Sequence, residues 1–159
     1  MSSEEYRRQE AELDDLYREI IIDHYRNPRH KGHLTAPSAC HEGVNPLCGD
    51  EVTVEVALDG GTLGEIAYSG SGCSISQSSA SMMAEAVAGK SVPEARRLIA
   101  DFTAMMRGDE SIDLDALGDL EALSGVRKFP VRIKCATLAW HTLAEALTEA
   151  GASKYEGQA

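Results

Sequence analysis

The chain has 159 residues, of which 26 are acidic and 15 are Lys or Arg, giving a formal net charge of −11. This length suffices for a buried core without disulfides, and we expect one domain with its core at about residues 10–150. The negative charge disfavours nucleic acid and membrane as partners, because it repels phosphate groups. The sequence shows neither a secretion signal nor an apolar run of roughly 20 residues, so we expect a cytoplasmic protein.

The first half of the sequence predicts a helix, a loop and a β-hairpin. Apolar residues recur every three or four positions over Glu10–Arg26, which is typical of an amphipathic helix. The next segment, to Asn45, has no period and is expected to be a loop, with a short extended piece near Cys40. Residues 51–58 alternate between apolar and polar side chains and are followed by a glycine turn, so 62–69 are predicted to return as the second strand of an antiparallel hairpin.

The second half predicts three helices and an acidic segment. A helix is expected from Cys73 to Gly89, and another begins at Ser91, where Ser91 and Glu94 have the spacing of a capping box. Residues 109–125 are acidic with scattered leucines, which predicts a surface excursion with at most a short helical turn. Pro130 opens the last helix and Gly151 is expected to end it, leaving a frayed tail at 151–159.

Four chemically reactive side chains occupy the edges of these predicted elements. Cys48 and Asp50 precede the first strand, Cys73 begins a helix, and Cys135 lies in an early helical turn. Three thiolates and one carboxylate form a four-ligand set suited to zinc, and Arg132 and Lys134 could offset part of its negative charge. The residues alone leave three alternatives open, namely a shared metal site, a structural zinc or unlinked core cysteines.

Other candidate ligands are interpreted as peripheral. Cys40 is expected to be a spare thiol, and we expect no disulfides in a reducing compartment. Surface or capping roles are predicted for four histidines: His24, His30, His33 and His41. Core packing is the expected role of Trp140 and of four methionines: Met82, Met83, Met105 and Met106.

Four segments, "LYREIIIDHYRNPRHKG", "NPLCGD", "SGSGCSISQSSASMM" and "GVRKFPVRIKCATLAW", occur in this order over most of the chain. Together they resemble the IscU-like (NifU N-terminal) family of iron-sulfur cluster assembly proteins, and within it the SUF-type branch, SufU. The resemblance implies an α+β fold in which a small antiparallel β-sheet packs against helices. Two features favour this branch: Lys134 stands where scaffold members have histidine, and residues 107–127 form an acidic insertion.

The resemblance also implies a site and a function. It makes Cys48, Asp50, Cys73 and Cys135 the metal ligands, with Zn²⁺ as the metal. It implies a zinc-dependent sulfurtransferase in which Cys48 accepts persulfide sulfur from a cysteine desulfurase of the SUF type. The sulfur would pass to a downstream iron-sulfur scaffold or a low-molecular thiol. The alternatives are a scaffold that binds a [2Fe-2S] cluster on the same ligands and a zinc-stabilised interaction domain.

Overall fold

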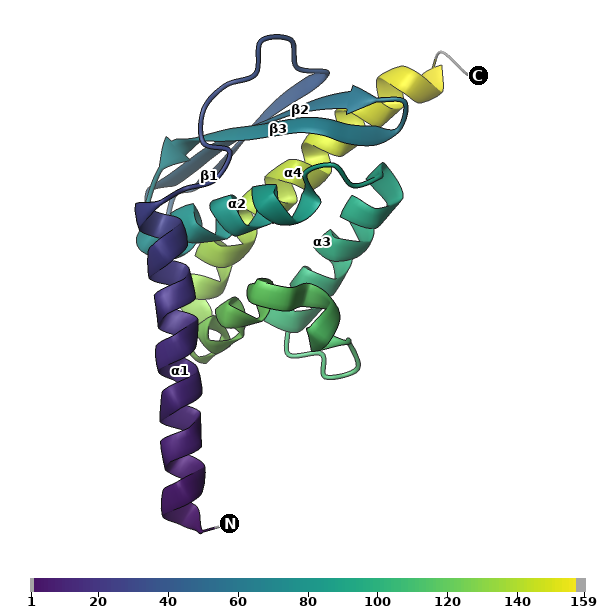
Figure 1. Ribbon diagram of the computed structural model, residues 1–159. Helices are drawn as coiled ribbons and strands as arrows, with labels where there is room; N and C mark the ends of the chain where they lie inside the picture. Colours follow the sequence, from purple (N-terminus) through teal and green to yellow (C-terminus); the bar gives the residue numbers. More distant parts are fainter. Residues whose placement is uncertain (1, 157–159) are drawn as a thin grey trace.

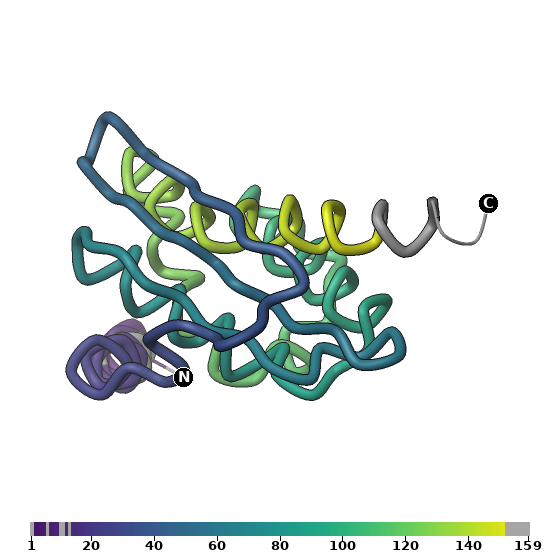
Figure 2. Tube along the Cα trace, turned by 90° about the horizontal axis from the view of Figure 1, so that it is seen from above, coloured from purple at the N-terminus to yellow at the C-terminus, as the bar shows by residue number. Residues whose placement is uncertain are grey.

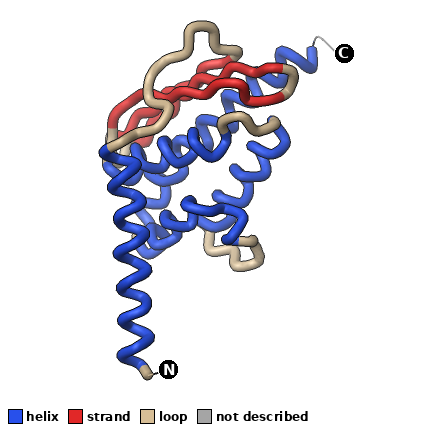
Figure 3. The backbone as a smooth tube through the Cα atoms, in the orientation of Figure 1, coloured by secondary structure: helices blue, strands red, loops and turns tan. Residues whose placement is uncertain are grey.

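The computed structural model describes residues 2–156, without the side chains of residues 6, 10, 11, 13 and 152–156 (Figure 1). In chain order its elements are α1 (Ser3–Arg26), β1 (Ala39–Asn45), β2 (Asp50–Asp59), β3 (Thr62–Ser71), α2 (Ser74–Val87), α3 (Val92–Met106), η1 (Leu114–Lys128) and α4 (Pro130–Glu156). The strands form an antiparallel sheet in the order β1-β2-β3. Figure 3 shows the sheet lying across the helical layer. The predicted α+β class is confirmed.

The hairpin of β2 and β3 supplies one side of the core. Alternate residues of β2, such as Val54 and Val56, point toward the helices and are fully buried, as the strand period of two requires. From the helical side, the Trp140 ring of α4 stacks on Phe102 of α3 with 4.4 Å between ring centroids. The Trp140 indole N–H donates to the Ser79 hydroxyl at 3.1 Å, so its polar atom is also satisfied. The predicted packing role of Trp140 is confirmed.

Strand β1 lies at the edge of the sheet and is placed by α4. It pairs with β2 from Ala39↔Val56 to Asn45↔Asp50, and Figure 2 shows it running above α4. A Cβ atom on Gly43 would clash with the Thr142 hydroxyl, so the absent side chain lets strand and helix approach closely. This strand occupies the last part of the predicted loop and extends the short piece expected near Cys40 to Asn45.

The helices α1 and α4 are longer than predicted. Helix α1 begins at Ser3 instead of Glu10, and the Ser2 hydroxyl caps it by accepting the Glu5 N–H at 3.2 Å. Helix α4 continues through Gly151 to Glu156, because Gly151 does not adopt the left-handed conformation that would end the helix. Residues 157–159 of the predicted tail lie outside the described residues. Within the described chain, none of the helices could cross a membrane.

The acidic segment is not the surface excursion that the sequence predicts. Residues 114–128 form η1, a 3₁₀ helix interrupted at Gly118, where φ is +57°. Its apolar side chains at a spacing of three are buried against α1 and α3: Leu117, Leu120, Leu123 and Val126. Gly118 interrupts the helix after Leu117, and the three residues per turn of a 3₁₀ helix put Leu120, Leu123 and Val126 on one face. The segment therefore contributes to the core while its acidic residues stay on the surface.

His24 is buried, whereas the sequence predicts a surface or capping role for it. Its side chain lies between α1 and α2. Its Nδ1 lies 2.8 Å from the Ser81 hydroxyl, which also accepts the Arg29 N–H at 2.9 Å. Burial lowers the pKa of His24, and the positive charge of Arg29 adds to this effect. His24 is therefore a core residue that fixes the end of α1 to α2.

Candidate metal centre

Four chain segments meet at one end of the sheet. They are the tight turn between β1 and β2, the end of β3, the first residue before α2 and the second turn of α4. Cys48 lies in the turn, Asp50 begins β2, and Cys73 is the N-cap of α2. Gly49 has φ +70°, a conformation that glycine adopts at little cost, so the turn can place Cys48 and Asp50 close together. The predicted convergence of these segments is present.

Three of the four predicted ligands form a tight group. The donor atoms of Cys48, Asp50 and Cys135 all lie within 4.8 Å of one another, and the sulfurs of Cys48 and Cys135 are 3.2 Å apart. The side chains of Asp50 and Cys135 are fully buried, whereas Cys48 is partly exposed. Cys135 therefore lies deeper than the sequence suggests, at the floor of the site, and Cys48 lies at its mouth.

Cys73 adjoins this group through Asp50. The Cys73 N–H donates to Asp50 Oδ1 at 2.9 Å, and the Cys73 sulfur lies 3.9 Å from Oδ2. The sulfur also accepts the Ser76 N–H at 3.4 Å, as an N-cap side chain does. It thus lies at the N-terminal, positive end of the α2 helix dipole.

Gly72 forms part of the wall behind Asp50. A Cβ atom at this position would lie 2.5 Å from Asp50 Oδ1 and 2.6 Å from the Ser76 hydroxyl. Only a residue without a side chain lets the backbone approach the carboxylate this closely. Gly72 is therefore a packing requirement of the site.

Asn45 is a residue of the site that sequence reasoning missed. Its side chain is buried, and its Nδ2–H donates to the Cys135 sulfur at 3.8 Å. Its backbone carbonyl oxygen accepts the N–H groups of Cys48 and Gly49 at 3.2 and 2.9 Å. Asn45 thus closes the turn and contacts the buried sulfur. Its position directly before Pro46, three residues ahead of Cys48, was the available signal, since Asn-Pro favours turn initiation.

The donor set fits a zinc ion. Burial raises the pKa of the Cys135 thiol far above its usual range, and its contacts with Cys48 and Asp50 add to this rise. A buried cluster of thiols and a carboxylate is costly unless a cation offsets the negative charge. Zinc takes four sulfur, nitrogen or oxygen ligands, which matches Cys48, Asp50, Cys73 and Cys135 in number and type.

The other candidates lie apart from this cluster. Cys40 is exposed on β1, and His33 and His41 pair with the carboxylates of Glu55 and Glu149. Lys134 is exposed, and Arg132 lines a groove beside α1. The charge compensation expected from Arg132 and Lys134 therefore stays a prediction.

Fold and site together define an α+β protein that gathers cysteine and aspartate side chains at one end of a small antiparallel sheet. The chain belongs to the NifU-like N-terminal domain family, whose model matches residues 16–136.

Named relatives lie within the same family. The chain is 48% identical to the zinc-dependent sulfurtransferase SufU of Bacillus subtilis, over 92% of this chain and 96% of the relative. It is 44% identical to the iron-sulfur cluster assembly scaffold protein IscU of Streptococcus pyogenes, over 86% of each chain. A crystal structure from Fervidobacterium islandicum, described as a candidate scaffold protein for the SUF system, has a TM-score of 0.78 and 36% identity, covering 81% and 94% of the two chains.

Proposed function

We propose that this chain is a zinc-dependent sulfurtransferase of iron-sulfur cluster assembly that works in the cytoplasm. It would accept persulfide sulfur from a cysteine desulfurase of the SUF type. The observation that carries the proposal is that the donor atoms of Cys48, Asp50 and Cys135 lie within 4.8 Å of one another, with the Cys73 N–H hydrogen-bonded to Asp50. The similarity to the Bacillus subtilis sulfurtransferase over nearly the whole chain supports the same conclusion.

The four side chains would hold the metal in different ways. Asp50 and Cys135 are buried and held by neighbouring groups, so they form the fixed part of the site. Cys73 is held at the start of α2 by the Ser76 N–H. When bound, zinc would keep the cysteine thiols deprotonated at neutral pH.

Cys48 is the proposed sulfur acceptor because it is partly exposed, on a turn whose neighbour Leu47 is 75% exposed. Its thiolate would attack the outer sulfur of the desulfurase persulfide. The new sulfur–sulfur bond forms as the old one breaks, and the donor cysteine leaves as a thiolate. Electrons balance without an external oxidant, and Cys48 carries the sulfur as a persulfide. A low-molecular thiol or a downstream scaffold would then remove this sulfur by the same exchange.

A second candidate function is assembly of a [2Fe-2S] cluster on the same ligands. It is favoured by the relative from Streptococcus pyogenes, which is named a scaffold protein. Metal analysis separates the two candidates. We expect an aerobically purified, colourless protein with about one zinc per chain, because one four-ligand site holds one ion. A brown protein with bound iron would favour the scaffold.

Sulfur transfer itself is tested by the release of alanine from cysteine by a SUF-type desulfurase. We expect the chain to stimulate this release and Cys48→Ala to abolish the stimulation. Cys40→Ala is the matched control, because Cys40 is a cysteine outside the cluster and should be dispensable. Stimulation that survives Cys48→Ala would rule out Cys48 as the sulfur acceptor.

A further inference from the structure

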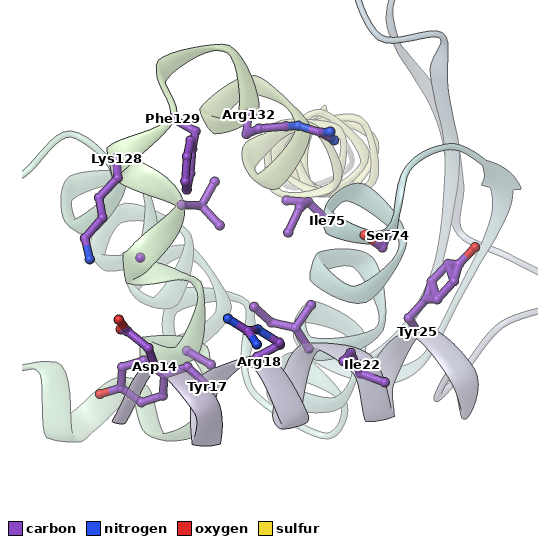
Figure 4. A pocket seen from close by; sticks show the side chains of 14 residues that line it. Asp14, Tyr17, Arg18, Ile22, Tyr25, Ser74, Ile75, Lys128, Phe129 and Arg132 are labelled. Carbon is purple, nitrogen blue, oxygen red and sulfur yellow. The ribbon is translucent and has the colours of Figure 1, made fainter. Parts of the chain in front are cut away.

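A groove of about 640 Å³ runs between α1 and the junction of η1 with α4 (Figure 4). Apolar side chains of α1, α2, η1 and the residue between η1 and α4 line it: Ile21, Ile22, Ile75, Val126 and Phe129. Several large apolar side chains are exposed here, among them Phe129 with an exposed fraction of 62% and Tyr25 with 48%. A continuous apolar surface of this kind commonly marks a place where another chain binds.

Cations surround this apolar surface. Arg18, Lys128 and Arg132 line the groove together with one carboxylate, Asp14. Arg107 and Arg127 line an adjoining hollow, which also holds Glu110. These are five of the 15 Lys and Arg residues in a chain of net charge −11. In the part of the chain that the structure describes, only Arg18 of these five forms an ion pair, an exposed contact of 3.7 Å with Asp15. The groove therefore fits an acidic segment with an apolar face.

The N-terminal half of α1 is an acidic segment in the same chain, and its sequence holds three apolar residues, Tyr6, Ala11 and Leu13. This half extends away from the rest of the protein (Figure 1). Residues 2–15 include six acidic and two basic residues, and the described side chains among them, such as Glu4, Glu5 and Glu12, are exposed. An isolated helix of this length has marginal stability in water, so a binding surface would stabilise it.

We propose that the groove binds the N-terminal half of α1 from a second copy of the chain. In a two-fold symmetric pair, each copy would place its acidic helix in the basic groove of the other. Because α1 itself forms one wall of the groove from Asp14 to Tyr25, the two helices would pack antiparallel. The first turn of the incoming helix would then lie near Tyr25 and Ser74, one residue from Cys73. The described end of α4 lies on the far side of the molecule (Figure 1).

The proposal is tested by sedimentation equilibrium with two charge-reversed variants. The groove variant is Arg18→Glu with Lys128→Glu, and the helix variant is Glu4→Lys with Glu5→Lys and Glu12→Lys. We expect the wild type to form dimers. Each variant alone should dissociate at least about tenfold more readily, because its helix and its groove carry charge of the same sign.

The mixture of the two variants gives the sharper result. In a heterodimer of the two variants, the acidic helix of one meets the basic groove of the other, and the basic helix meets the acidic groove. The mixture should therefore form heterodimers with an affinity within about threefold of the wild type. The matched control is Lys90→Glu with Arg97→Glu, which changes the net charge as the groove variant does but lies on exposed positions away from the groove. It should dimerise like the wild type.

Two results would overturn the proposal. One is a wild-type chain that stays monomeric up to about 0.5 mM, well above the working range of a specific contact. The other is a dimer that neither variant weakens although circular dichroism shows both to be folded. Either result would leave the groove to an acidic helix of a different protein.

Discussion

Asp50 combines two properties that rarely occur together, since it is fully buried and it lies among thiols instead of cations. Its Oδ1 accepts one N–H from Cys73, which is modest compensation for a buried carboxylate. We therefore expect Asp50→Ala to remain folded by circular dichroism while zinc affinity falls at least about tenfold, measured by competition with a chelator. Asp50→Asn keeps the shape of the side chain but removes its charge, so its zinc affinity should lie between those of the wild type and Asp50→Ala. Unchanged affinity in both variants would exclude Asp50 as a ligand.

His24 should make the stability of the fold depend on pH. Burial lowers its pKa from the ordinary value of 6.5, so the folded chain binds this proton less readily than the unfolded chain. The stability that His24 contributes is fully present above pH 6.5 and is lost as the pH falls below it. His24→Gln keeps a side chain that can bond Ser81 but cannot titrate. Between about pH 7.5 and 5.5, the urea midpoint of the wild type should fall more than that of His24→Gln. Parallel midpoints would contradict this account.

Among the elements, the β3–α2 connection places the site with the least tolerance for change. A Cβ atom on Gly72 would lie 2.5 Å from Asp50 Oδ1, so Gly72→Ala must displace either the carboxylate or the backbone before Cys73. We expect weaker zinc binding and lower stability in this variant. Gly125→Ala is the matched control, because nothing lies within 4 Å of its Cβ position and its φ is not left-handed. The control should be neutral or slightly stabilising in the same chelator and urea titrations.

The sequence predicted those elements whose local pattern and tertiary role agree. The hairpin around Gly60 and Gly61, the N-cap position of Cys73 and the capping box of α3 are confirmed, because alternation, turn chemistry and capping are local properties. Strand β1 was largely missed, because Gly43 packs against α4 and leaves no apolar alternation to read. The segment η1 was predicted only as a short helical turn, because its leucines repeat at three residues and not at the 3.6-residue period of an amphipathic α-helix.

The site was predictable to a similar extent. Its four ligand candidates were chosen from residue type, position and family resemblance, and the structure brings three of their donor atoms together. The roles of Asn45 and Gly72 depend on contacts with residues 90 and 22 positions away along the chain, with Cys135 and Asp50 respectively. Neither contact follows from local sequence. The depth of Cys135 likewise follows from how α4 packs against β1 and β2.

For the whole molecule, the site joins parts of the fold that are distant in sequence. Its residues come from the β1–β2 turn, the start of α2 and α4, so metal binding would link the sheet to two helices. A ligand that binds only the folded state stabilises it by about 2.7 kcal/mol at a hundredfold excess over its Kd. In a chain of this size, each kcal/mol shifts the Tm by about 2–4 °C. Removing zinc should therefore lower the Tm by at least about 5 °C.

Scanning calorimetry with and without a chelator at neutral pH measures this shift. Cys40→Ser should show the wild-type shift, because Cys40 lies outside the cluster, whereas Cys135→Ser should have a low Tm that the chelator no longer changes. A single transition in both states is expected, since the ligands belong to elements that share one hydrophobic core. If the chelator removes the metal and leaves the Tm of the wild type unchanged, the cluster does not couple metal binding to folding. The same zinc could then leave or be displaced without any effect on the stability of the sheet and its helices.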